Sequence, residues 1–180
     1  MPIKPQILKT DTVARSRLFE IEELSLRFSN GVERTYERLS TRGYGAVMII
    51  PLLSADEVLL INEYAAGIHD YQLTLPKGLI DAGETALEAA NRELMEEVGY
   101  GARTLTHLKT MTTSPSYMGH KIEVIIASDL YPKRLPGDEP EEIEVVPYPI
   151  KDLPTLMLDE NFAEARVIAA ILLWLQQREV

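Results

Sequence analysis

Alternation of apolar and polar residues predicts a β-hairpin in the N-terminal part of the chain. Every second residue is apolar from Leu24 to Phe28, and a second alternating stretch follows Asn30-Gly31. Asn-Gly is typical of tight hairpin turns because both residues tolerate positive φ. We therefore expect a hairpin over residues 18–39. Its first strand loses the alternation at Glu22-Glu23, which predicts a bulge or bend in that strand.

Four further strands follow from apolar runs and from alternation. Gly45–Leu53 is apolar throughout, as buried strands are, and Glu57–Tyr64 is expected to pair with it across a short turn. Leu105–Thr112 and Lys121–Ser128 complete the set. The segment Pro132–Pro140 contains three prolines and a glycine, so we expect a loop there.

Two segments have the pattern of helices. Thr85–Val98 begins with a capping box, Thr85-x-x-Glu88, and is followed by a glycine. Asn161–Gln177 is apolar on nearly all sides in its second half, so it must be covered on two faces. Strands around one central helix, with a second helix at the C-terminus, predict an α/β or α+β sandwich. We expect it to span residues 44–180, after an N-terminal arm of residues 1–43.

Composition narrows the possible functions. The chain has 180 residues, of which 46% are hydrophobic, enough for an ordinary core. The longest apolar run is far shorter than the roughly 18 residues of a membrane span, and the N-terminus lacks a signal-type apolar core. A net charge of −10 disfavours nucleic acid as a partner. The absence of cysteine excludes thiolate chemistry and is compatible with a cytoplasmic location.

One string concentrates the acidic chemistry. It begins at Gly78 and reads Gly-x5-Glu-x7-Arg-Glu-Leu-x-Glu-Glu-x-Gly-Tyr. On a helix the carboxylates of Glu93, Glu96 and Glu97 share one face, where their like charges repel. Arg92, four residues from Glu96, offsets only part of this charge. Oxygen ligands of this kind select Mg²⁺ or Mn²⁺, so the string predicts a divalent-cation site.

For any single pair of these glutamates, a solvent-exposed charged helix is the ordinary explanation. A chance match to eight constrained positions is on the order of one in a million at this composition. The string resembles the Nudix box, and only Tyr100 departs from it, where an aliphatic residue is usual. The resemblance implies the Nudix α/β/α sandwich of mixed sheets, with the box helix and a C-terminal helix. It also implies hydrolysis of a diphosphate joined to a nucleoside, with Mg²⁺ or Mn²⁺ as cofactor.

The same resemblance implies roles for single residues. Glu93, Glu96, Glu97 and the Gly78 carbonyl are expected to bind metal, with Glu96 as a shared member of the catalytic cluster. Arg92 is expected to orient the carboxylates. In some Nudix branches the residue that matches Glu93 is the catalytic base, so the roles within the cluster stay open.

A second acidic segment, GDEPEE at residues 137–142, has two interpretations. Its proline and glycine content is typical of a solvated loop. In ADP-ribose pyrophosphatases, however, a glutamate of the matching loop acts as base and its neighbour two residues on binds metal. That resemblance assigns the base to Glu139 and an auxiliary metal ligand to Glu141.

Stretches outside the box resemble the NudE-type ADP-compounds hydrolases, within the ADP-ribose pyrophosphatase-like branch. They are TVARSRLF at 12–19, FSNGVERTYER at 28–38, KGLIDAGE at 77–84, EAANRELMEEVG at 88–99, SPSY at 114–117, DLYP at 129–132 and GDEPE at 137–141. The family cleaves ADP-ribose, NADH and diadenosine oligophosphates and releases AMP. Glu63-Tyr64-Ala65 departs from the Gln-Tyr-Arg usual in that branch, and Lys77 would partly replace the missing arginine.

The same resemblance implies substrate-binding residues, an oligomeric state and partners. We expect six substrate-binding residues: Arg38, Arg42, Tyr64, Lys77, Ser114 and Tyr117. The apolar side of the hairpin arm, and the family, predict a homodimer acting on a small nucleotide, without nucleic acid or membrane as partner. Two alternatives stay open, namely a nucleotide-sugar pyrophosphatase of the GDP-mannose type and a Nudix-fold module that binds nucleotides without hydrolysing them.

Overall fold

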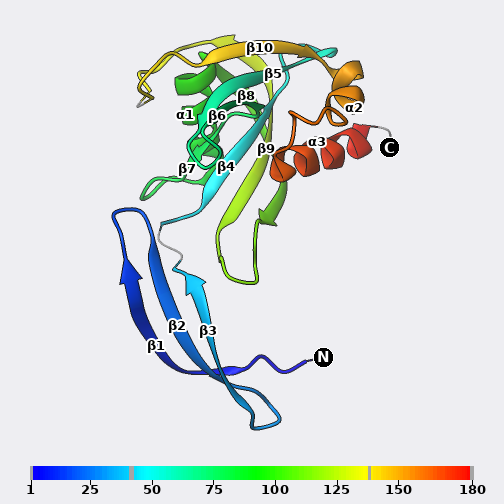
Figure 1. The fold of residues 1–180 in the computed structure, drawn as a ribbon. Coiled ribbons are helices and arrows are strands. Elements are labelled where there is room, and N and C mark those ends of the chain that lie inside the picture. Colours follow the sequence, from blue (N-terminus) through cyan, green and yellow to red (C-terminus); the bar gives the residue numbers. More distant parts are fainter. Residues whose placement is uncertain (1, 41–42, 138, 179–180) are drawn as a thin grey trace. The chain divides into compact units, whose positions relative to one another are not determined.

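The computed structural model describes residues 2–40, 43–137 and 139–178 (Figure 1). The chain divides into two compact units. The first comprises Met1–Arg42 and Thr112–Lys121, and the second Gly43–Met111 and Ile122–Val180. Within the described residues no helix is long and apolar enough to cross a membrane.

The first unit is built on a three-stranded antiparallel sheet in the order β1-β2-β3. Its strands are β1 (Gln6–Arg15), β2 (Glu20–Arg27) and β3 (Glu33–Leu39). The predicted hairpin is confirmed as β2 and β3, and Gly31 in its turn has φ of 83°. Strand β1 was missed, because its polar and apolar residues show no sustained alternation.

The bulge expected in β2 lies in the neighbouring strand instead. Strand β2 keeps a continuous register with β3 over Ile21–Arg27, so nothing is inserted at Glu22-Glu23. Strand β1 instead has two register shifts, at Leu8 and at Val13, and the second faces this point, since Thr12 pairs with Glu22 and Ala14 with Ile21. The physical reason is that β2 is hydrogen-bonded on both sides, whereas an edge strand can accommodate an unpaired residue.

The described residues of the second unit form two sheets and five helical segments. One sheet has the order β7-β4-β9-β8 and the other β10-β5-β6. The strands are β4 (Ala46–Pro51), β5 (Glu57–Ala65), β6 (Asp70–Thr74), β7 (Lys77–Leu79), β8 (Tyr100–Thr112), β9 (Lys121–Pro132) and β10 (Glu144–Pro149). The helical segments are α1 (Ala86–Glu93), the π-helical η1 (Leu94–Val98), the short 3₁₀ turn η2 (Ile150–Asp152), α2 (Leu153–Leu156) and α3 (Ala165–Arg178).

The pairing expected between β4 and β5 is wrong. Strand β4 pairs with β7 and, in parallel, with β9, whereas β5 pairs with β6 and β10. A single isolated bridge, Leu52 to Val58, joins the ends of the two strands. Every residue of β4 is buried, as are four successive residues of β5. Such strands need cover on both faces, and each therefore lies inside its own sheet.

Alternate residues of β4 pack in two different hydrophobic cores. Met48 and Ile50 pack in the core that includes Trp174 of α3, while Val47 and Ile49 pack in the core that includes Leu94 of η1. The sheets are thus covered by α3 on one side and by α1 with η1 on the other. This arrangement confirms the predicted α/β/α sandwich.

The helix of the acidic string begins and ends as its sequence predicts, but it is not regular throughout. Thr85 forms the capping box with Glu88, and Gly99 ends the helix at φ of 79°. Between them α1 changes to a π-helical turn, η1, which contains the last two glutamates of the string. Helix α3 begins at Ala165, four residues later than expected.

Candidate active site

Strand β7 and helix α1 meet at Gly78 and Glu93. A Cβ atom on Gly78 would lie 2.0 Å from Cδ of Glu93 and 2.1 Å from its Oε1. Only a residue without a side chain permits this approach. Two of the residues expected to bind metal, 15 positions apart in the string, are therefore in contact.

Arg92 connects the carboxylates that surround this contact. Its Nη1 donates to Oε1 of Glu93 at 2.7 Å and to Oε2 of Glu96 at 2.9 Å. Its Nε donates to Oε1 of Glu84 at 2.8 Å. The Arg92 guanidinium lowers the pKa of Glu84, and these carboxylates raise the pKa of Arg92. Arg92 thus fixes the direction of three acidic side chains at once.

Glu88 forms the expected capping contacts at the start of α1. Its Oε2 accepts hydrogen bonds from the backbone N–H of Thr85 and from the Thr85 hydroxyl, both at 2.8 Å. These bonds lower the pKa of Glu88. Glu88 therefore caps the helix, whereas Glu84 lies beside Arg92.

Glu97 is the most buried carboxylate of the string, with 5% of its surface exposed. Its Oε2 accepts the backbone N–H of Lys77 at 3.0 Å. Burial raises the pKa of Glu97 to about 8, and the charges of Glu63 and Glu93 act in the same direction. A buried carboxylate with this many negative neighbours favours a bound cation when it is ionised.

Two residues outside the helix converge on Glu97. Carboxylate oxygens of Glu63, Glu97 and Glu139 all lie within 4.8 Å of one another. Glu63 comes from β5 and Glu139 from the loop before β10, so three separate segments supply the group. Sequence reasoning assigned no role to Glu63. Its charge could have indicated a role in the site, because Glu63 stands where the ADP-ribose pyrophosphatase-like branch usually has an uncharged glutamine.

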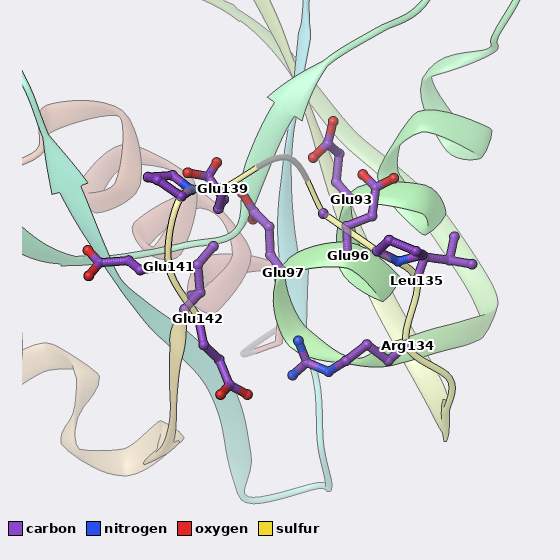
Figure 2. A pocket seen from close by; sticks show the side chains of 12 residues that line it. Glu93, Glu96, Glu97, Arg134, Leu135, Glu139, Glu141 and Glu142 are labelled. Carbon is purple, nitrogen blue, oxygen red and sulfur yellow. The ribbon is translucent and has the colours of Figure 1, made fainter.

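Glu93, Glu96, Glu97 and Glu139 line a cavity of about 470 Å³, together with other described residues of 134–137 and 140–143, before β10. Figure 2 shows Glu97 between the helix side chains of Glu93 and Glu96 and the loop residue Glu139. A neighbouring space of about 480 Å³ shares these glutamates and continues past Gly78 and Arg92. An extended ligand could therefore lie across the carboxylates.

Glu141 and Tyr64 lie beside this cluster rather than in it. The Tyr71 hydroxyl of β6 donates a hydrogen bond to Glu141. The Tyr64 hydroxyl is 2.7 Å from Nδ1 of His69. Both tyrosines line a further cavity, of about 400 Å³, together with Glu63 and Glu139.

Lys77, expected to bind phosphate, is largely enclosed by protein. Its Nζ forms an ion pair with Glu63 and lies 3.3 Å from Oγ1 of Thr74 and 3.9 Å from Oε2 of Glu164. Its ammonium group therefore offsets part of the negative charge of Glu63 and Glu164, near Glu97.

Three of the expected substrate-binding residues belong to the first unit. Arg38 is in the first unit, where its Nε donates to Oε2 of Glu22 at 2.8 Å. Ser114 and Tyr117 form a turn in the same unit, closed by a 3.1 Å backbone hydrogen bond. Arg42 lies outside the described residues.

The donor set fits a hard divalent cation. All its ligands would be oxygens, Glu97 is buried among other carboxylates, and the missing side chain of Gly78 leaves its backbone open against Glu93. Glu93, Glu96, Glu97 and the Gly78 carbonyl are the residues that would hold such an ion.

A helix–sheet–helix sandwich with this helix-borne carboxylate cluster defines the class of Nudix hydrolases. The NUDIX domain model matches residues 44–171, and the model of the NudE-type Nudix hydrolase N-terminal domain matches residues 5–38. The chain therefore belongs to the Nudix hydrolase family, and within it to the NudE type. It is an enzyme of the pyrophosphohydrolase kind.

Individual relatives agree with this assignment. ADP compounds hydrolase NudE of Escherichia coli (strain K12) is 50% identical over 96% of this chain and 94% of its own. ADP-ribose pyrophosphatase of Bacillus subtilis (strain 168) is 26% identical, covering 91% of each chain. A crystal structure of an ADP compounds hydrolase matches with a TM-score of 0.92 at 49% identity, over 99% of this chain and 97% of that chain.

Proposed function

We propose that this enzyme hydrolyses the diphosphate linkage of ADP-containing compounds, among them ADP-ribose, NADH and diadenosine oligophosphates, and releases AMP. The observation that carries the proposal is the convergence of Glu63, Glu97 and Glu139 beside the Gly78–Glu93 contact. Such a group of carboxylates suits a diphosphate only with cations between them. The names of the relatives, ADP compounds hydrolase and ADP-ribose pyrophosphatase, point to ADP as the common part of the substrates.

The cation in this proposal is Mg²⁺ or Mn²⁺. When bound, it would neutralise the diphosphate and make an attacking water more acidic. Glu93, Glu96, Glu97 and the Gly78 carbonyl are the proposed ligands, and Glu141 an auxiliary one that would have to leave Tyr71. Arg92 keeps Glu93 and Glu96 in place through its two Nη1 hydrogen bonds.

Glu139 is the proposed general base. It lies opposite Glu97, on a loop and not on the helix, and Figure 2 shows it directed toward the carboxylate group. A base in that place would accept the proton of the water that attacks phosphorus, a contribution of about 10²–10⁴-fold in rate. Glu96 stays the alternative catalytic carboxylate, since it lines the same cavity.

The six substrate-binding residues keep their assignment as proposals. Lys77 would act at the phosphates only by exchanging its ion pair with Glu63 for a substrate oxygen. Tyr64 offers a half-exposed ring to the adjoining cavity. Arg38, Arg42, Ser114 and Tyr117 are assigned from the family resemblance alone. The cytoplasmic location also stays a prediction.

A homodimer is the proposed assembly. The first unit exposes several large apolar side chains on and beside its small sheet: Ile7, Val13, Leu18 and Phe19. A second copy of the chain would cover such a surface. Sedimentation at micromolar concentration should give about twice the chain mass of 20.3 kDa. A species of single-chain mass would contradict the proposal.

A substrate panel tests the function. Purified enzyme with Mg²⁺ should release AMP from ADP-ribose, NADH and diadenosine compounds, and excess EDTA should stop the release. Faster release of GMP from GDP-mannose would favour the nucleotide-sugar alternative. Binding of ADP-ribose without product over several hours would favour the binding module.

A further inference from the structure

Lys77 holds two of the three converging carboxylates at once. Its backbone N–H donates to Oε2 of Glu97 at 3.0 Å, and its Nζ forms an ion pair with Oε2 of Glu63. The first bond is fixed by the backbone of β7, whereas the second depends on the direction of a long and flexible side chain. Whatever holds the ammonium group in place therefore also decides where the charge of Glu63 lies relative to Glu97.

Thr74 and Glu164 also contact this ammonium group. Nζ of Lys77 lies 3.3 Å from Oγ1 of Thr74, which in turn lies 2.9 Å from Oε2 of Glu164. The same Glu164 oxygen is 3.9 Å from Nζ of Lys77. An ammonium group can only donate and an ionised carboxylate can only accept, so the Thr74 hydroxyl accepts from Lys77 and donates to Glu164. The three groups therefore form one closed network in which the hydroxyl has a single orientation.

Glu164 brings the start of the C-terminal helix into this network. It directly precedes α3, and its backbone carbonyl accepts the N–H of Ile168 at 3.1 Å. Its Oε1 is buried and forms an ion pair with Arg166, while its Oε2 faces Thr74 and Lys77. Both oxygens of the carboxylate are thus held, and only 17% of the side chain is exposed. A residue 90 positions from Thr74 in the sequence therefore fixes the ammonium group beside the site.

The charges of this network alternate in sign. The Lys77 ammonium contacts two negative groups, Glu63 and Glu164. Because these side chains are largely enclosed by protein, their attractions are screened less than those of surface pairs. Without Glu164, the buried Thr74 hydroxyl would lose its acceptor at 2.9 Å. The lysine side chain would then be held on the side of Glu63 alone and could turn away together with that carboxylate.

We infer that Glu164 is a positioning residue of the active site. Through Thr74 and Lys77 it keeps the charge of Glu63 beside Glu97, where that charge strengthens the binding of a cation. This inference rests on the proposed function, which places a cation at the neighbouring carboxylates. Loss of a residue that holds the side chains of a metal site in place typically lowers metal affinity or activity by about 10- to 100-fold.

Two substitutions of nearly unchanged size test the inference. Glu164→Gln removes the charge, and Thr74→Val removes the hydroxyl. Each should weaken binding of Mn²⁺ about tenfold in calorimetry and lower kcat for AMP release about tenfold, with KM for ADP-ribose little changed. Glu160→Gln makes the same change of charge at an exposed residue after α2 and should stay within about twofold of the parent enzyme. Equal losses in Glu160→Gln and Glu164→Gln would assign the effect to net charge and overturn the inference.

A double-mutant cycle tests whether Glu164 acts through Lys77. Lys77→Met removes the ammonium group and keeps most of the side-chain stem. In that background Glu164→Gln should weaken Mn²⁺ binding by no more than about twofold, because the contact that Glu164 supports is already gone. A purely structural role at the start of α3 would give the same loss in both backgrounds and would refute the positioning role. If Lys77→Met does not fold, the cycle of Glu164→Gln with Thr74→Val decides in the same way, since additive losses there would also refute it.

Titration with Mn²⁺ alone separates this inference from the proposed function, because neither substrate nor turnover enters the measurement. If the parent enzyme binds Mn²⁺ but releases no AMP from any substrate, the proposed function fails, and the titration still decides on Glu164. If Glu164→Gln and Thr74→Val bind Mn²⁺ as tightly as the parent enzyme, the inference fails even for an active enzyme. A parent enzyme that binds no Mn²⁺ would contradict the inference as well.

Discussion

Gly78 touches the carboxylate of Glu93, so closely that a Cβ atom on the glycine would lie 2.0 Å from Glu93 Cδ. Real Cβ atoms do not approach another atom to this distance. The contact joins β7, where the acidic string begins, to the last residue of α1. A side chain at position 78 would displace either the strand or the carboxylate, and both belong to the proposed metal site.

Gly78→Ala should therefore weaken binding of Mn²⁺ and lower AMP release by at least tenfold, with little loss of secondary structure. Calorimetry with Mn²⁺ and circular dichroism measure the two effects. Gly67→Ala is the matched control, because a Cβ there meets nothing within 4 Å and its φ is not positive. Equal metal binding by both variants would contradict the proposed arrangement.

Glu97→Gln should lower turnover by several orders of magnitude while the fold persists. Without metal the buried site opposes ionisation of Glu97, and the change replaces this carboxyl by a neutral amide of similar size, so the metal-free protein should be at least as stable as the parent. Steady-state AMP release and thermal unfolding check the two halves of this prediction. Glu160→Gln serves as the exposed control. Full activity of Glu97→Gln would remove it from the ligand set.

The raised pKa of Glu97 makes the stability of the metal-free protein depend on pH. The carboxyl titrates at about 8 in the folded protein and near 4.5 when unfolded. The folded state therefore holds a proton that the unfolded state has released between those values, and the free energy of unfolding falls as pH rises through that window. The fall is on the order of a few kcal/mol.

Urea unfolding in EDTA at pH 6 and pH 9 measures this dependence. The parent protein should be less stable at pH 9, and the difference should shrink in Glu97→Gln. Added Mg²⁺ should restore stability at pH 9 more than at pH 6, because only the ionised carboxylate binds metal. The same pH dependence in parent and variant would show that another group causes it.

Arg92→Lys should lower the activity strongly, although the substitution keeps the positive charge. A lysine ammonium cannot hold Glu84, Glu93 and Glu96 in the geometry that the planar guanidinium provides. We expect kcat to fall by about tenfold or more with a smaller change in stability, since the pairs are partly exposed. Replacement of exposed Arg34 by Lys is the control. Identical kcat in both variants would contradict the orienting role of Arg92.

Thr85→Ala should destabilise the protein by about 1 kcal/mol through loss of the capping box. Thr85→Ser retains the hydroxyl and should recover most of the difference. Chemical unfolding of the two variants provides the measurement. A loss of equal size in both would show that the methyl group of Thr85, and not its hydrogen bond, stabilises the helix start.

The sequence alone determined the features that depend on neighbours along the chain. The helix limits at Thr85 and Gly99 follow from local capping, and the contact of Arg92 with Glu96 follows from the helical repeat. The turn at Gly31 follows from Asn-Gly in the same way. Each of these involves residues only a few positions apart, where backbone geometry leaves few alternatives.

The tertiary structure decided which distant residues meet. Glu63 and Glu139 are 76 positions apart, yet both reach Glu97, and Tyr71 reaches Glu141 across 70 positions. These contacts depend on strand pairing, and β4 and β5 lie in different sheets although the short turn between them favoured a hairpin. Pairing between strands is chosen by burial of both sheet faces at once, a property of the whole core that no local pattern contains.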